Sequence, residues 1–596
     1  MEINYRKNNN KLIFDNFHDK ELLNMKNCQN YIPLYNNFFT LNDKNYDLIN
    51  LNNEKYLYSL KEKKTENIFS GSIKNENQKL IETTIFFKLS PLLDPFKYMA
   101  GKYQLDNNLL KLPKLNDSNI HFKINDINNS AYVDGFFTYL TSQLLNRMNF
   151  VHGLDFYGSF LGIKNNYHLD IGDDIDMLQS NDFFHENTNK LFSFINTDHE
   201  MLFNEDSRKN KKILNFGENI DTDVLNIEDI IEDNNTQSNI FNISNNENNT
   251  IKSEVNEGIN ESINETINNS LLVYEYNKSK KSNLSNLSNS SSSECSSRSS
   301  NTEKSKENLL SDDDDDDDSN NEDDSDESSS DIESIMVSIN EFPVQIIALE
   351  KCFNTLDYLF TDEKLGQEEL SCIVIQILMT LITYQKMFNL THNDLHTNNI
   401  MYVETEKKFL YYKVNNKHYK IKTFGKIFKI IDFGRAIYRY KNKLIYSDSF
   451  HSDGDANTQY NSEPYFNKDK ARLEPNNSFD LCRLGCSIYD FISEKYEDIS
   501  DIKSGIHKII INWCKDDDGR DILYKNNGEE RYPDFKLYKM IARKVNNHIP
   551  IYELQNKYFD KYIVSRKEIK KGSHIWNIDI LPESKELSDN NIVNIN

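Results

Sequence analysis

Two stretches of this 596-residue chain decide its fold: residues 391–401, THNDLHTNNIM, and residues 430–436, IIDFGRA. The first has a His-x-Asp triplet with an asparagine five residues after the aspartate, and the second ends an apolar segment with Asp-Phe-Gly. The apolar run before the first stretch predicts a long helix over residues 367–388. Strands are predicted at 400–403, 409–414, 418–424 and 427–431, with a turn at Asn415–Asn416. The polar residues of both stretches are therefore expected on loops beside a buried helix and strands.

The residue types in these stretches suit phosphoryl transfer, which needs positioning and charge neutralisation more than covalent chemistry. Asp394 could face an attacking hydroxyl and accept its proton. The Asn399 amide oxygen and the Asp432 carboxylate are hard oxygen ligands of the kind that Mg²⁺ prefers. His392 is predicted to brace the loop, and Gly434 to allow a sharp turn after the metal-binding aspartate.

A third motif, FDLCRLG at 479–485, supplies an aspartate that is expected to brace the catalytic loop, Asp480. With all three in this order, the chain resembles a divergent eukaryotic-type Ser/Thr protein kinase, and more closely the kinase-like proteins of large nucleocytoplasmic DNA viruses. The resemblance covers about residues 67–165 and 341–575. It implies ATP and Mg²⁺ (or Mn²⁺) as cofactors and a protein substrate. It also implies a cytoplasmic location, which would be the host cell's for a viral protein, or packaging in a virion.

The N-terminal half carries weaker signals of the same family. Lys88 ends an apolar strand, as the family's ATP-anchoring lysine does, and Phe69-Ser70-Gly71-Ser72 is the only candidate for a phosphate-contacting glycine before it. No GxGxxG is present. The predicted helix at 132–148 offers Asp134, in place of the family's glutamate, as the partner of Lys88. Lys88, Gly71 and Asp134 are thus predicted to bind the nucleotide, with a solvated lysine and a solvated acid as the alternative interpretation.

The segment QIIALEKC, residues 345–352, resembles the family's fifth strand and the hinge that hydrogen-bonds adenine. Glu350 to Cys352 are expected to form this hinge, with Leu349 guarding the back of the pocket.

Departures from the family pattern leave other functions open. Asn393 replaces the arginine that reads a phosphorylated activation segment, so control by such phosphorylation is not expected. His396 replaces a lysine, and a partly charged imidazole could assist at the γ-phosphate. The closing Ala-Pro-Glu is missing. The alternatives are a small-molecule kinase of the aminoglycoside or choline type, a pseudokinase scaffold, and an interaction protein working through its acidic loop.

These observations predict an α+β, bilobal protein-kinase-like fold with a β-rich N-lobe, a helical C-lobe and a long disordered acidic insertion. The predicted boundaries are an N-terminal extension at 1–66, the first part of the N-lobe at 67–165, the insertion at 166–340, the last N-lobe strand and hinge at 341–352, the C-lobe at 353–575 and a tail at 576–596.

The net charge of −25 is concentrated in residues 312–333, which hold 14 carboxylates and no base. This run is interpreted as a solvated loop, or as a docking segment for a basic partner. The rest of the sequence shows no cluster of basic residues of the kind that binds nucleic acid. The seven cysteines form no CxxC pair, and the longest apolar run, at 373–383, is about half a membrane span. A soluble protein that binds neither nucleic acid nor membranes is predicted.

Overall fold

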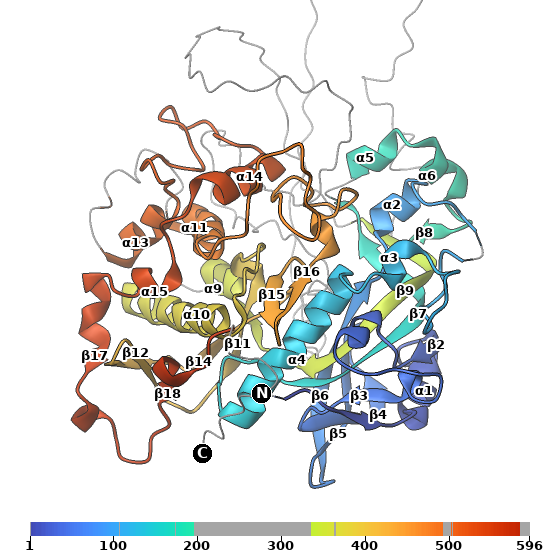
Figure 1. The fold of residues 1–596 in the computed structure, drawn as a ribbon, viewed down its shortest axis with the longest axis horizontal. Helices are drawn as coiled ribbons and strands as arrows, with labels where there is room; N and C mark the ends of the chain where they lie inside the picture. Colours follow the sequence, from blue (N-terminus) through green and yellow to red (C-terminus); the bar gives the residue numbers. More distant parts are fainter. Residues whose placement is uncertain are drawn as a thin grey trace, which may run out of the picture. The chain divides into compact units, whose positions relative to one another are not determined.

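The computed structural model describes residues 2–106, 108–172, 175–195, 335–362, 365–492, 502 and 505–584. Its architecture is mixed α+β, with most of the strands of the main sheet in the N-terminal part and most of the long helices later in the chain (Figure 1). The predicted α+β class is confirmed. Most of the predicted insertion, including the acidic run at 312–333, lies outside the described residues.

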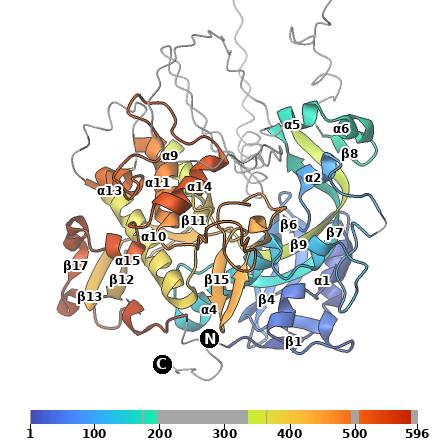
Figure 2. The ribbon, with the colours of Figure 1, turned by 45° about the horizontal axis from the view of Figure 1, so that its top comes forward.

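The main sheet is antiparallel at every pair of neighbouring strands; all of its strands are labelled in Figure 1, and part of it is seen from another side in Figure 2. The strands on this path, in spatial order, are β2 (Met25–Gln29), β7 (Phe156–Asp170), β9 (Met336–Glu350), β6 (Leu80–Pro91), β5 (Ile68–Asn75) and β4 (Lys55–Lys63). A short strand, β8 (Phe192–Phe194), adds to β9 off this path. Residues far apart in sequence thus form one sheet.

Residues 2–66 contribute two strands to this sheet, so the prediction of residues 1–66 as an N-terminal extension is wrong. Strand β4 pairs with β5 and β2 pairs with β7. Helix α1 (Lys11–His18) covers one face of the sheet, where the Phe17 ring meets Phe87 at 5.8 Å and Phe160 at 5.5 Å. Scattered aromatics in an Asn-rich segment gave no periodic signal, yet burying them stabilises this part of the sheet.

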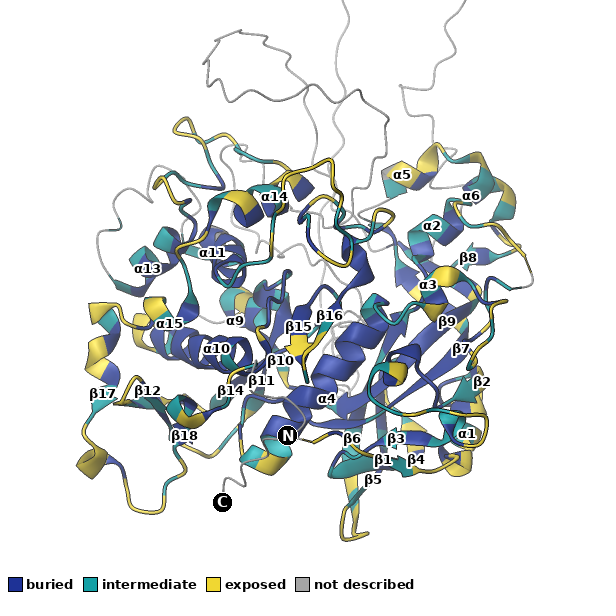
Figure 3. Ribbon diagram, in the orientation of Figure 1, coloured by how far each residue is buried: buried dark blue, intermediate teal, exposed yellow. Residues whose placement is uncertain are grey.

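Helix α4 (Ser130–Met148) lies between the main sheet and the C-terminal helices (Figure 1). Fourteen consecutive residues, from Ala131 to Leu144, are buried, and Figure 3 shows the helix dark along most of its length. Its Phe137 ring packs against those of Phe433, at 4.5 Å, and Tyr384, at 5.4 Å. This burial on all sides explains why the helix shows little amphipathic pattern, since neither face is left to solvent.

The predicted insertion boundaries, 166 and 340, are also wrong. Strand β7 continues to Asp170, and β9 begins at Met336. Between β7 and residue 196 lie two short helices, α5 (Ile175–Gln179) and α6 (Asp182–Asn187), and β8.

The C-terminal part is built on α10 (Gln367–Phe388), which has the bounds that the sequence predicted. It is long and apolar enough to cross a membrane by length and composition alone, but 94% of its most apolar window is buried inside the protein, as in a core helix. The other helices of this part are α9 (Leu356–Asp362), α11 (Phe479–Ile492), α13 (Gly505–Trp513), α14 (Phe535–Lys544) and α15 (Pro550–Glu553).

The predicted hairpin after the first motif is confirmed as β12 (Phe409–Val414) and β13 (Lys417–Lys422). Its turn residues, Asn415 and Asn416, have φ of 48° and 60°, the left-handed conformation that two-residue hairpin turns require and asparagine tolerates. Strands β17 (Ile563–Val564) and β18 (Trp576–Asn577) flank this hairpin. Because β18 and the residues up to 584 are docked, the predicted tail boundary at 576 is too early.

The remaining elements are short connecting pieces. The strands are β1 (Tyr5–Lys7), β3 (Ile49–Leu51), β10 (Asn354–Thr355), β11 (Ile400–Glu404), β14 (Lys426–Ile430), β15 (Ile437–Tyr440) and β16 (Lys443–Tyr446), and the helices are α2 (Pro95–Met99) and α3 (Phe122–Asn125). Strands β10, β11 and β14 form a small sheet of their own.

A buried histidine is expected to make stability depend on pH. His152 is fully buried, with Nδ1 2.6 Å from the Phe428 carbonyl and Nε2 2.6 Å from the Tyr412 hydroxyl. Burial lowers the pKa of His152 from 6.5 to about 4. The unfolded chain binds this proton first as the pH falls, so about 3 kcal/mol of stability is lost between pH 6.5 and pH 4.

The measurement is the free energy of unfolding at several pH values for the unmodified protein, His152→Gln and, as an exposed control, His18→Gln. We expect a shallower loss on acidification for His152→Gln alone. A pH dependence identical in all three proteins would contradict the assignment.

Candidate functional site

The two motifs of the sequence come together because the strands beside them pair. Strand β11, after the first motif, is antiparallel to β14, before the second. The Ile431 N–H donates to the Asn399 carbonyl at 3.0 Å, which joins the motifs at the end of this strand pair. Asn393 and Asp432 have φ of 68° and 63°, a left-handed conformation that Asn and Asp adopt more readily than most residues.

Helix α11 stabilises the loop of the first motif through Asp480, as predicted. The fully buried Asp480 carboxylate accepts hydrogen bonds from the N–H groups of His392 and Asn393, both at 2.9 Å. His392 also lies 2.9 Å, through Nε2, from the Ile431 carbonyl of the second motif. The loop is therefore fixed by backbone contacts on both sides.

Lys88 joins the main sheet to both α4 and the second motif. Its ammonium lies 2.7 Å from Asp134 Oδ2 and 2.9 Å from Asp432 Oδ1. The Phe433 N–H donates to Asp134 Oδ1 at 2.8 Å, so the acid on α4 also holds the second motif. The sequence proposed Asp134 as the partner of Lys88, and the structure brings the two together.

Charge in this cluster is shared unevenly. Burial opposes the charge of Lys88, but the two carboxylates outweigh it and raise its pKa above the ordinary value. Burial raises the pKa of Asp134 against the attraction of Lys88. At Asp432 burial is outweighed by Lys88, and the pKa falls to about 2. One lysine between two carboxylates leaves an excess of negative charge, which favours a cation beside Asp432.

Asp394 faces a partly open position, with 18% of its side chain exposed. Its Oδ1 accepts a hydrogen bond from the Tyr538 hydroxyl at 2.8 Å and lies 3.9 Å from Arg435 Nη1. Burial alone would raise the pKa of Asp394, but Arg435 and neighbouring groups hold it below its ordinary value. The carboxylate is therefore charged at neutral pH and able to accept a proton.

Asn399 is oriented by its own donors. Its Nδ2 donates to the Asp394 carbonyl at 2.9 Å and lies 3.1 Å from His396 Nε2. With the amide nitrogen used in this way, Oδ1 is the atom left to bind a cation.

His396 lies beside Asn399 and is partly buried. Burial lowers the pKa of its imidazole to about 4, which favours the neutral form. Its contact with Asn399 Nδ2 makes Nε2 an acceptor. In this structure the histidine orients Asn399, and the catalytic role expected for it stays a prediction.

Gly71 is not in a phosphate-contacting loop. It lies in the middle of β5, opposite Leu60 on β4 and Thr83 on β6. A Cβ at this position would come within 2.5 Å of the Ser59 carbonyl oxygen, so glycine is needed for close strand packing. The assignment to the nucleotide site is wrong. The turn between β4 and β5 is Lys64-Thr65-Glu66-Asn67, and it contains no glycine.

The expected hinge, Glu350 to Cys352, connects β9 to β10. The Glu350 carboxylate pairs with Lys429 and accepts from the Asp155 N–H at 2.6 Å, so its side chain ties the strand ends together. Cys352 is buried, and in the part of the chain that the structure describes its N–H donates to no protein group. The Glu350 N–H donates to the Asp155 carbonyl at 2.9 Å, so the backbone and the side chain of Glu350 both have structural roles. The adenine contact expected at this connection stays a prediction.

Three residues near Asp394 were missed from the sequence: Arg435, Arg483 and Tyr538. Arg435 directly follows Asp-Phe-Gly and could have been noticed as a cation beside the second motif. Tyr538 lies 144 positions after Asp394, on a helix whose position follows only from tertiary packing. No local pattern marks it.

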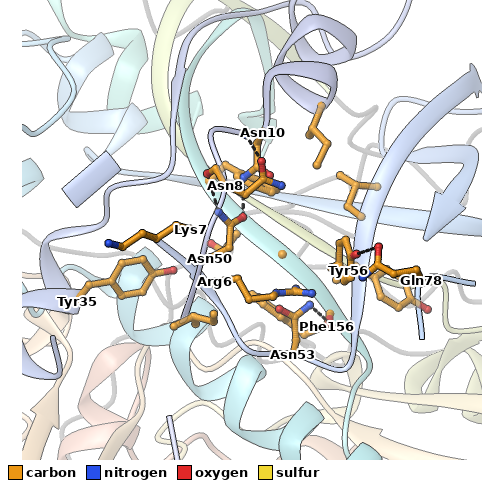
Figure 4. Close-up of a pocket in the computed structure, with 17 residues that line it drawn as sticks. Arg6, Lys7, Asn8, Asn10, Tyr35, Asn50, Asn53, Tyr56, Gln78 and Phe156 are labelled. Carbon is orange, nitrogen blue, oxygen red and sulfur yellow. Dashed lines mark hydrogen bonds between the residues drawn. The ribbon is translucent and has the colours of Figure 1, made fainter. Parts of the chain in front are cut away.

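A cavity of about 180 Å³ lies elsewhere, between β1, β3, β4 and the start of β7 (Figure 4). Arg6 lies over the Tyr56 ring at 3.8 Å from its centre. Both residues line the cavity, together with Asn8, Asn50 and Asn53. Its lining includes Ile13 of α1, and none of the residues predicted from the sequence. It is therefore a separate feature from the site around Lys88 and Asp394.

The donors present suit a magnesium ion coordinated partly by phosphates. Asn399 Oδ1 and the Asp432 carboxylate are hard oxygens, and Mg²⁺ commonly takes one or two carboxylates and completes its shell with phosphates and waters. Among the described residues no group of three or more His, Cys, Asp or Glu side chains could hold a metal. A set of one amide and one carboxylate depends on the bound phosphates to complete it.

Comparison of the chain with protein-family models finds no match, and comparison with curated proteins finds none either.

Asp448 fastens the start of α4 to the segment after the second motif. The buried carboxylate lies 2.5 Å from the Lys123 ammonium and accepts from the Ser130 N–H at 2.9 Å, while its own N–H donates to the Asn128 carbonyl at 2.8 Å. These contacts hold the N-terminus of α4, and with it Asp134, in place.

Asp448→Asn is expected to lower the free energy of unfolding by about 3 kcal/mol, because the Lys123 charge loses its buried partner. Hydrogen exchange at the first turns of α4 should also become faster. The matched control is Asp516→Asn, since Asp516 is a similarly buried acid whose partner, Arg520, lies in a distant loop. Equal exchange at α4 in both variants would contradict a specific role for Asp448.

Proposed function

We propose that this protein is a kinase that transfers the γ-phosphate of ATP, with Mg²⁺ or Mn²⁺, to a serine or threonine hydroxyl of a protein. The observation that carries the proposal is the convergence of four segments, separated in sequence, on one site. Lys88 comes from the main sheet and Asp134 from α4, and both meet the Asp432 loop next to Asp394 and Asn399.

The fold that we propose is the bilobal one expected of such an enzyme. The strand order β4-β5-β6-β9-β7, with α4 in the connection between β6 and β7, supports a nucleotide-binding lobe. The C-terminal part, built around α10 and α11, supports a second lobe that carries Asp394. The hinge would be the connection after β9.

Each residue then has a role that follows from its chemistry. Lys88 would neutralise nucleotide phosphates, and Asn399 and Asp432 would hold the metal, which when bound neutralises charge on the transferring phosphoryl group. Asp394 would accept the proton as the acceptor oxygen bonds to phosphorus. The bond from the γ-phosphorus to the bridging oxygen breaks, and ADP leaves.

A second candidate is a pseudokinase scaffold, and a specific observation favours it. The turn at 64–67 has no glycine, so the close backbone approach that phosphates need is not provided there. Against it stands the complete set of Lys88, Asp394, Asn399 and Asp432. A small-molecule acceptor is the other alternative, because Ala-Pro-Glu is missing from the sequence.

The test is a screen of acceptors with γ-labelled ATP and Mg²⁺, using basic proteins, acidic proteins, the chain itself and small hydroxyl compounds. Label on protein serine or threonine is the expected result. Label on small hydroxyl compounds alone would replace the protein acceptor with a small one. Mg²⁺–ATP binding without any transfer would favour the scaffold.

A further inference from the structure

The Asp394 carboxylate is held from the side by a helix that the motifs do not include. Tyr538 lies on α14 and is fully buried, and its hydroxyl donates to Asp394 Oδ1 at 2.8 Å. Arg483, on α11, donates from Nε to the same hydroxyl oxygen at 2.9 Å. Helix α14 therefore contacts the carboxylate oxygen directly, and α11 contacts it only through the tyrosine hydroxyl.

The direction of this chain of hydrogen bonds is fixed by chemistry. A guanidinium has donors and no acceptor, so the Tyr538 oxygen must accept from Arg483. Its single proton is then directed at Asp394. The Arg435 guanidinium, 3.9 Å from the same Oδ1, adds attraction on that side. Among the residues that the structure describes, no side chain hydrogen-bonds Oδ2.

We propose that Tyr538 is a positioning residue for the phosphoryl transfer proposed above. By holding Oδ1, it sets the rotation of the Asp394 carboxylate so that Oδ2 faces the acceptor hydroxyl. A general base must lie within hydrogen-bond reach of the proton that it removes, and small misplacements are costly in rate. The inference rests on the proposed function.

The phenol ring has a separate, structural task. It packs against the Phe535 ring at 5.7 Å and the Phe479 ring at 6.2 Å. The Arg435 and Arg483 guanidinium groups also lie near the ring, 5.5 Å and 5.1 Å from its centre. Phenylalanine keeps the ring and its packing while removing the proton donor, so Tyr538→Phe separates the positioning role from the structural one.

The experiment compares steady-state kinetics of the unmodified protein, Tyr538→Phe and Tyr489→Phe. Tyr489 is a matched control on α11, because it is equally buried and donates its hydroxyl to a different carboxylate, Asp521, at 3.1 Å. We expect Tyr538→Phe to lower kcat by about 10- to 100-fold. The KM values for ATP and acceptor, and the melting temperature relative to Tyr489→Phe, should stay unchanged.

An unchanged kcat in Tyr538→Phe, with transfer intact, would overturn this inference and leave the proposed function standing. Equal losses of kcat and melting temperature in both variants would assign Tyr538 a structural role only. Absence of transfer by the unmodified protein would overturn the proposed function and this inference together.

Discussion

Replacement of Asp394 by asparagine is expected to lower γ-phosphate transfer by about 10³-fold and to leave the affinity for Mg²⁺–ATP nearly unchanged. Asparagine preserves the shape of the side chain and could still accept from Tyr538, but its amide cannot take up the acceptor's proton. The carboxylate is charged at neutral pH, because Arg435 and its neighbours hold the pKa of Asp394 down against the effect of burial. The substitution therefore removes the group that accepts the proton and leaves the shape of the side chain unchanged.

The control is Asp453→Asn, an exposed aspartate in the segment after the second motif. Its rate and nucleotide affinity should match those of the unmodified protein. Undiminished transfer by Asp394→Asn would remove Asp394 from the mechanism, whatever the fold.

Lys88→Met is expected to lower transfer at subsaturating ATP by about 100-fold or more, mainly through weaker nucleotide binding. The structure adds a second effect. Without the lysine, Asp134 and Asp432 lose the charge that they share, so the protein should also lose about 3 kcal/mol of stability, as when one partner of a buried ion pair is removed. Nucleotide titration and thermal unfolding measure the two effects separately.

Lys164→Met is the matched control for this prediction. Lys164 is a buried lysine of the same sheet, on β7, and lies 3.6 Å from Glu66 Oε1. We expect it to lose stability but to keep its affinity for ATP. If both variants lost ATP affinity equally, the effect of Lys88 would be explained by stability alone.

Much of the C-terminal part was predictable because its signals are local. The apolar run over Gln367–Phe388 contains a complete helix, and Asn415-Asn416 between alternating segments is the chemistry of a hairpin turn. The loop with Asp394 and Asn399 is marked by spacing alone. These features depend on neighbours in sequence, which a single chain shows directly.

Other features depend on tertiary contacts and could not be predicted. The role of Gly71 follows from the neighbouring strand β4, whose Ser59 carbonyl leaves no room for a Cβ. The order in residues 2–66 comes from packing of α1 and β4 onto a sheet completed by β9, more than 250 residues later. Tyr538 reaches Asp394 only because α14 packs against α11. For residues 2–66 and for Tyr538, the decisive partner lies far away along the chain.

The most direct test of the central claim is transfer of label from γ-labelled ATP to protein by the unmodified chain, with Mg²⁺, with the metal chelated, and with Asp394→Asn. The account predicts label on serine or threonine that needs the metal and is nearly abolished by the substitution. Failure of the intact protein to bind Mg²⁺–ATP, or labelling that persists equally in Asp394→Asn, would contradict it.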